Sequence, residues 1–187
     1  MIITIFGGSQ PSTGDAAYEE AYQLGAALAK AGHTVCTGGY VGTMEAASKG
    51  AAQAGGHVVG ITCREIESWR PIKANRWITE EWSYATLSER LTALIKRSDA
   101  AIALPGGIGT LAEILMAWNH LAIQAITPRP LILVGEAWRT TLTAFIESQA
   151  LYIAELDRAL LHYAKTIKEA VVIIEEFTKI SKQAGTR

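Results

Sequence analysis

The sequence predicts a single α/β domain: a Rossmann-like, doubly wound parallel sheet with helices on both faces. Short apolar runs of strand length alternate along the 187-residue chain with longer stretches of helical periodicity. Strands that alternate with helices in this way form right-handed crossovers in a parallel sheet. The continuous apolar run 100–104 is typical of a strand buried on both faces. Because no linker divides the chain, we expect one domain over residues 1–180 and a loose C-terminal tail over residues 181–187.

Capping residues, glycines and apolar periodicity mark the individual elements. Ser12, Thr13 or Asp15 can cap the first helix, and Gly32 can end it. The segment 64–82 is less regular, because charges, a proline and three tryptophans crowd it, and long loops of this kind often serve as lids or partner surfaces. The expected strands are 2–6, 34–37, 58–62, 76–79, 100–104, 131–134 and 161–164, and the expected helices are 15–31, 43–54, 84–97, 110–125, 137–150 and 167–180.

Composition and charge exclude several classes of function. The formal net charge of -1 gives no electrostatic reason to expect a nucleic-acid polymer as partner. The longest stretch without a charged residue, 114–128, is too short and too polar for a membrane span, and no basic segment precedes the first apolar run, so we expect neither a membrane anchor nor a secretory signal. Two isolated cysteines, Cys36 and Cys63, indicate a cytoplasmic protein without a disulfide framework. The four histidines have no metal-binding spacing, so no metal is expected.

Three glycine pairs each follow a predicted strand directly. They are Gly7-Gly8, Gly38-Gly39 and Gly106-Gly107. The carboxyl ends of parallel strands share one edge of the sheet, and ligands bind there. Short turns also favour glycine for its backbone freedom alone. Three pairs at one edge favour a shared binding crevice over that simpler explanation.

The segment 104–113, LPGGIGTLAE, reads as strand, glycine loop and helix start. Free N–H groups and the positive end of the helix dipole at such a start suit a phosphate. The pair Thr110 and Glu113 also has the spacing of a capping box, in which Glu113 would only cap its own helix. No GxxxxGK[ST] or GxGxxG motif occurs, and the second strand is not followed by the acidic residue that holds a dinucleotide ribose. A P-loop NTPase is thereby excluded, and an NAD-type site is disfavoured.

Arg90 lies on the helix that precedes this loop. At 100° per residue it falls at the edge of an apolar stripe formed by Leu87, Leu91, Leu94 and Ile95. A guanidinium in this position can extend to solvent, or it can reach into the crevice and hold a phosphate or a ribose oxygen. The spacing alone leaves both interpretations open.

These motifs together resemble those of the LOG family, which was long labelled lysine decarboxylase-like. Residues 105–113 match its PGGxGTxxE motif, residues 38–44 match its GGxxGxM element, and the likeness extends to Gly7-Gly8-Ser9 and to the Ser88-Glu89-Arg90 region. The resemblance implies a Rossmann-like homodimer that hydrolyses the N-glycosidic bond of nucleoside 5'-monophosphates, AMP or cytokinin-type, to the free base and ribose 5-phosphate. It implies no cofactor, and no lysine here has a recognisable pyridoxal-phosphate setting.

The resemblance also assigns residues to roles. Arg90 and Glu113 match the catalytic arginine and glutamate of the family. The resemblance implies a phosphate site formed by Gly106, Gly107, Gly109 and Thr110. It implies a substrate site around the phosphate, formed by Gly8, Ser9, Gly39 and Met44. A carboxylate such as Glu113 can hold the ribose hydroxyls, stabilise oxocarbenium charge or orient water.

Three residues depart from the family pattern, and the altered Leu87–Leu91 pattern motivates a second hypothesis. Leu87 and Leu91 replace a methionine and a lysine, and Glu45 stands where many members have glycine. The alternative function is a non-catalytic binding or carrier module for a phosphorylated small molecule, of the nucleotide-sensor or molybdenum-cofactor carrier type. The helix 114–125 is apolar nearly all round, which fits burial within one subunit or at a homodimer interface.

Overall fold

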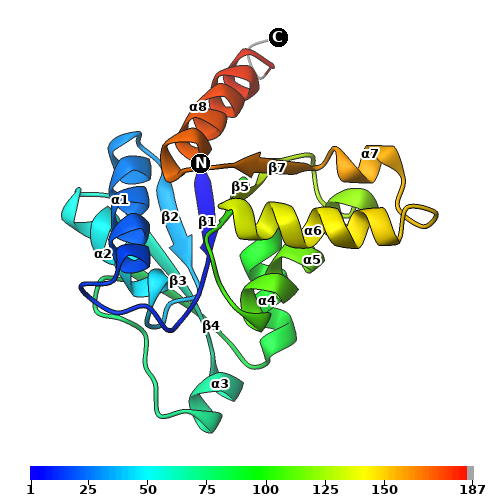
Figure 1. Ribbon diagram of the computed structural model, residues 1–187. Coiled ribbons are helices and arrows are strands. Elements are labelled where there is room, and N and C mark those ends of the chain that lie inside the picture. Colours follow the sequence, from blue (N-terminus) through cyan, green and yellow to red (C-terminus); the bar gives the residue numbers. More distant parts are fainter. Residues whose placement is uncertain (185–187) are drawn as a thin grey trace.

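The predicted fold class is confirmed. A computed structural model describes residues 1–184 and shows one parallel sheet between two layers of helices (Figure 1). The strand order is β4-β3-β2-β1-β5-β6-β7. The strands are β1 (Ile2–Phe6), β2 (Thr34–Thr37), β3 (Val58–Cys63), β4 (Glu80–Tyr84), β5 (Ala100–Ala103), β6 (Leu131–Val134) and β7 (Leu161–Ala164).

The helices divide between the two faces of the sheet, and each layer has its own core cluster. One face is covered by α1 (Ala16–Lys30), α2 (Thr43–Gln53) and α8 (Ile167–Ala184), and the other by α4 (Leu87–Lys96), α5 (Ile108–Ala122) and α6 (Glu136–Ser148). Two short helices, α3 (Arg64–Trp69) and α7 (Glu155–Arg158), lie in the connections.

The central strand shows why the sheet must be covered twice. In β1, Ile3 and Ile5 belong to the cluster under α1, α2 and α8, whereas Phe6 belongs to the cluster under α4, α5 and α6. Alternate residues of a strand point to opposite faces, so an apolar strand requires a helix layer on each side. Thr4 is the polar exception, and its hydroxyl donates to the Leu94 carbonyl at 3.0 Å.

The sheet also fixes where a ligand can bind. β1 pairs in parallel with β2 on one side and with β5 on the other. The chain therefore builds the sheet outward in one direction from β1 to β4 and in the other from β5 to β7. In a doubly wound sheet the crevice at such a reversal, above the carboxyl ends of the strands, is the usual ligand site.

Three expectations are wrong, two for the connection between β3 and α4 and one for the C-terminal helix. The strand expected at 76–79 lies instead at Glu80–Tyr84, and the segment 64–69 is helical. Residues 70–79 run as a loop in which Ile78 covers the sheet: a Cβ on Gly60 would lie 2.2 Å from its Cδ1 atom. The last helix ends at Ala184 and not at residue 180, so 181–184 are helical, and 185–187 of the expected tail lie outside the described residues.

Within residues 1–184, no helix is long and apolar enough to cross a membrane.

Candidate functional site

The three glycine pairs come together at one edge of the sheet, as predicted. They follow β1, β2 and β5, which are neighbouring strands. The loops are bonded to one another: the Gly8 amide donates to the Pro105 carbonyl at 3.2 Å, and the Thr43 hydroxyl donates to the Gly8 carbonyl at 3.0 Å. A Cβ on Gly42 would lie only 2.4 Å from the same Gly8 oxygen. Glycine is therefore required here for close approach of two backbones.

The N-terminus of α5 opens at this edge, and with the glycine loop before it forms a cradle whose chemistry suits an anion. The helix begins at Ile108, whose side chain is 90% exposed, with Gly107 at the N-cap and no acidic residue in its first turn. The first N–H groups of a helix have no partner within it, and the positive end of the dipole lies there. The Thr110 side chain is buried against Gly106, where a Cβ would lie 2.2 Å from the Thr110 hydroxyl oxygen.

The capping-box interpretation of Thr110 and Glu113 is wrong. The helix starts before Thr110, so Thr110 occupies its third position and Glu113 lies in the second turn. The capping box in this region belongs to α4, where the Thr86 hydroxyl and the Glu89 side chain bond reciprocally. Glu113 is thereby free of any capping role and points toward Arg90.

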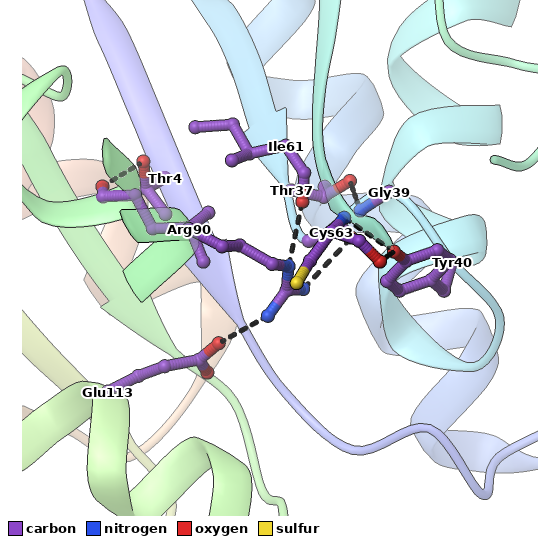
Figure 2. Close-up of polar contacts among 10 residues, drawn as sticks. Thr4, Thr37, Gly39, Tyr40, Ile61, Cys63, Arg90 and Glu113 are labelled. Atoms are coloured by element: carbon purple, nitrogen blue, oxygen red, sulfur yellow. Dashed lines mark hydrogen bonds and ion pairs between the residues drawn. The ribbon is translucent and has the colours of Figure 1, made fainter. Parts of the chain in front are cut away.

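Arg90 and Glu113 form a buried pair (Figure 2). Arg90 is 5% exposed and Glu113 is 9% exposed, and the Nη1 and Oε1 atoms are 4.0 Å apart. The Arg90 Nε donates to the Ile61 carbonyl at 2.8 Å, and its Nη2 donates to the Gly38 carbonyl at 2.9 Å. Arg90 is therefore buried against the backbone of β3 and of the loop after β2, and the interpretation in which it extends to solvent is wrong.

The surroundings of Glu113 change its ionisation. Burial raises the pKa of the Glu113 carboxyl to about 7, although the Arg90 guanidinium acts to lower it. A carboxyl group titrating near neutrality in a cleft is typical of functional sites, since it can both hold and release a proton.

Two further features of the pair were not predicted from the sequence. The carbonyls of Gly38 and Ile61 accept from Arg90, and the ring of Tyr40 lies 5.5 Å from the Arg90 Cζ atom. The glycine at 38 was a usable signal: a Cβ there would lie 2.0 Å from Arg90 Nη2 and 2.7 Å from Met44 Sδ. Met44 is thus placed next to the pair.

The remaining expected site residues divide into two groups. Gly8, Ser9, Gly106, Gly107 and Gly109 line the loops at the crevice and are exposed or half-buried, so a ligand can reach them. Gly39 is buried, with a φ of 83°, and its carbonyl accepts from the backbone and the side chain of Asn75. Its expected part in substrate binding stays a prediction.

Among residues 1–184, no group of three or more His, Cys, Asp and Glu side chains is arranged to hold a metal ion.

Fold and site together define a Rossmann-type protein with an open helix N-terminus and a buried arginine–carboxylate pair at the switch point of the sheet. The chain belongs to the SLOG cluster4 family, whose profile matches residues 1–171. The predicted resemblance to LOG proteins is thereby confirmed.

Similar proteins include curated enzymes of plants and bacteria. The cytokinin riboside 5'-monophosphate phosphoribohydrolase LOG3 of Arabidopsis thaliana is 29% identical over 99% of this chain and 86% of its own length. A cytokinin riboside 5'-monophosphate phosphoribohydrolase of Rhodococcoides fascians is 29% identical over 92% of this chain and 88% of its own length.

Similar solved structures include proteins named for binding or carrying the molybdenum cofactor. The molybdenum cofactor binding protein of Rippkaea orientalis has a TM-score of 0.72 and 27% identity, covering 95% of this chain and 96% of its own. The molybdenum cofactor carrier protein of Chlamydomonas reinhardtii, at 24% identity over 94% of this chain and 96% of its own, has a TM-score of 0.68 and supports the fold alone.

Proposed function

We propose that this protein hydrolyses the N-glycosidic bond of nucleoside 5'-monophosphates, AMP or cytokinin-type, and releases the free base and ribose 5-phosphate. The observation that carries the proposal is the buried Arg90–Glu113 pair, in which Glu113 lies on α5, the helix whose N-terminus forms the anion cradle. The activity for which the similar enzymes of Arabidopsis thaliana and Rhodococcoides fascians are named supports the same reaction.

The spacing along α5 suits a phosphorylated sugar. Glu113 follows Ile108 by five positions, which corresponds to about 7.5 Å of helix rise at 1.5 Å per residue. A 5'-phosphate bound at the helix N-terminus, with help from the Thr110 hydroxyl, would place the attached ribose over the Glu113 carboxyl group. One phosphorylated sugar thus spans the cradle and the carboxyl group.

The chemistry requires a carboxylate close to the ribose. Water attacks C1' while the C1'–N bond breaks, its electron pair leaves with the base, and positive charge develops on the ribose. Glu113 in its ionised form stabilises this charge and accepts the proton of the attacking water, while the departing base takes up a proton from solvent, to which Glu113 afterwards releases its own. A pKa of about 7 leaves a large share of Glu113 ionised at neutral pH.

The contacts of Arg90 restrict its role. Two of its three nitrogens donate to the backbone carbonyls of Ile61 and Gly38, and the third faces Glu113. We therefore assign Arg90 to holding and charge-balancing Glu113, and we assign the phosphate to the cradle. The sequence left open whether Arg90 holds the phosphate or balances the charge of the carboxylate, and the contacts favour the second role.

The test is a panel of nucleoside monophosphates, with chromatography to detect the released base. We expect release from AMP-like substrates, a much slower reaction with adenosine, and a loss of turnover of about 10²-fold or more in Glu113→Ala. Glu20→Ala, which removes an exposed carboxylate on α1, serves as the matched control and should leave turnover unchanged. Unchanged turnover in Glu113→Ala would overturn the assignment.

A second candidate function is a non-catalytic binding or carrier module for a phosphorylated small molecule. The replacements at Leu87 and Leu91 and the likeness to the Rippkaea orientalis protein favour it. This candidate predicts that the Glu113→Ala variant still binds AMP, as measured by calorimetry. It also predicts that no nucleotide of the panel releases its base. Turnover well above background removes this candidate.

We also propose that the protein is a homodimer that associates through the outer face of α5. Ile114 and Trp118 of this helix are buried in the subunit, but Leu115 and Ile123 are exposed. A groove of about 740 Å³ between the end of α5 and α7 continues this apolar surface. We expect light scattering to give the mass of a dimer, and Leu115→Glu to give a monomer. Val172→Glu, on an exposed apolar position of α8, is the matched control and should remain dimeric.

A further inference from the structure

Tyr40 closes the pocket that holds the Arg90 guanidinium. The guanidinium donates to two backbone carbonyls and faces Glu113, and the Tyr40 ring covers it at 5.5 Å from Cζ (Figure 2). This separation is within the range of a cation–π contact. Tyr40 is only 4% exposed, so its ring cannot swing away without opening the core.

The hydroxyl group of Tyr40 is itself anchored. It accepts from the Cys63 amide at 2.7 Å and has two acceptors for its single proton, the Cys63 carbonyl at 3.1 Å and the Glu67 Oε1 at 3.3 Å. The backbone carbonyl of Tyr40 accepts from the Asn75 side chain at 3.0 Å. The ring is therefore tied to the end of β3, to α3 and to the loop before β4.

We propose that Tyr40 is a positioning residue, which holds the Arg90 guanidinium at Glu113 by tying it to the end of β3 and to α3. Nothing else among the described contacts of Tyr40 reaches Glu113, so it acts only through Arg90. The hydroxyl fixes the ring, the ring restricts the guanidinium, and the guanidinium favours the ionised form of Glu113. Its importance for catalysis rests on the proposed function, whereas its effect on Glu113 does not.

Few other ionisable groups lie around the pair. Cys36 on β2 is close to Arg90, and Glu67 on α3 reaches Tyr40. Burial raises the pKa of the Cys36 thiol to about 12, and burial, as the largest cause, raises the pKa of Tyr40 to about 12. Both Cys36 and Tyr40 stay neutral from pH 4 to 9, so a titration seen there in the Glu113 signal does not come from either of them.

The experiment is an NMR titration of the side-chain carboxyl carbon of Glu113 in the full chain, with Glu113→Gln to assign the signal. In Tyr40→Phe the ring and the burial of Glu113 are kept, but the anchor of the ring is lost. We expect the midpoint of the titration to move upward by about half a pH unit or more, because Arg90 is held less firmly near the carboxylate. Ser98→Ala, which removes another buried hydroxyl bond at the opposite edge of the sheet, should leave the midpoint unchanged.

The outcomes separate positioning from mere support of the fold. A Tyr40→Phe protein that loses stability but keeps the wild-type midpoint overturns the proposal. If Tyr40→Phe does not fold, Glu67→Ala provides a second variant, because it removes one acceptor of the Tyr40 hydroxyl at a half-buried position of α3 and keeps the ring. The Arg90 Nε proton, bonded to the Ile61 carbonyl, should then exchange with solvent faster than in the wild type, and an unchanged rate also overturns the proposal. A shifted midpoint of the Glu113 titration, with no base released from any nucleotide, supports the positioning role of Tyr40. The same result counts against the proposed hydrolase function.

Discussion

Replacement of Glu113 by glutamine should change the way in which stability depends on pH. Burial raises the pKa of this carboxyl from its ordinary 4.5 to about 7, so between these two values the unfolded chain has lost the proton that the folded protein keeps. The free energy of unfolding of the wild type must then fall as the pH rises through this window. Glutamine has nearly the same shape and does not titrate, so the variant lacks this contribution.

The size of the effect follows from the two pKa values. A difference of about 2.5 pH units corresponds to about 3 kcal/mol, at roughly 1.4 kcal/mol per unit. Urea unfolding at pH values from 4 to 8 measures it, with every other titrating group common to both proteins. We expect the free energies of the wild type and Glu113→Gln to diverge by about this amount between pH 4.5 and 7. Parallel curves would show that Glu113 titrates normally, and would refute the assignment of a buried proton-exchanging group.

Two further substitutions test the pair and its support. Arg90→Met should lower the free energy of unfolding by about 3–5 kcal/mol at pH 8, because it leaves a buried carboxylate without its partner. The loss should be clearly smaller at pH 5, where Glu113 is protonated. Urea unfolding at both pH values measures the losses, and equal losses would contradict the pairing. Gly38→Ala would place a Cβ 2.0 Å from Arg90 Nη2 and should cost about 1–3 kcal/mol in the same assay. Gly109→Ala, where a Cβ meets nothing within 4 Å, is the matched control and should not destabilise the fold.

Much of the fold could be predicted because the central strands carry a simple signal. β1, β2, β6 and β7 have the expected bounds, and the first three are short apolar or β-branched runs that each end at a glycine. β4 is an edge strand that begins Glu80-Glu81 and is exposed along much of its length. A strand with so little burial has no apolar run to reveal it, which explains why the expected strand was placed four residues too early.

The site was predictable only in part, because side chains with a motif can be found in a sequence and backbone acceptors cannot. Arg90 and Glu113 were identified by their motif, but spacing did not decide whether Arg90 enters the crevice. Its direction depends on two carbonyl groups, those of Ile61 and Gly38, at the ends of two other strands. Any residue type can supply a carbonyl, so this pocket exists only once β2, β3 and α4 are packed together.

The same architecture accommodates both candidate functions, and this locates the difference between them. A carrier and a hydrolase would use the same cradle at the start of α5 to hold a phosphate. They differ in what the second turn of the helix must do. A carrier needs only a side chain at position 113 that contacts the ligand without repelling it. A neutral, hydrogen-bonding side chain would be sufficient for this and would cost less free energy to bury. The chain instead buries an ionisable carboxyl group and surrounds Arg90 with two carbonyls and the Tyr40 ring to hold a counter-charge near it. This arrangement stabilises a negative charge on Glu113 that binding alone does not require. For this reason we prefer the hydrolase to the carrier as the proposed function.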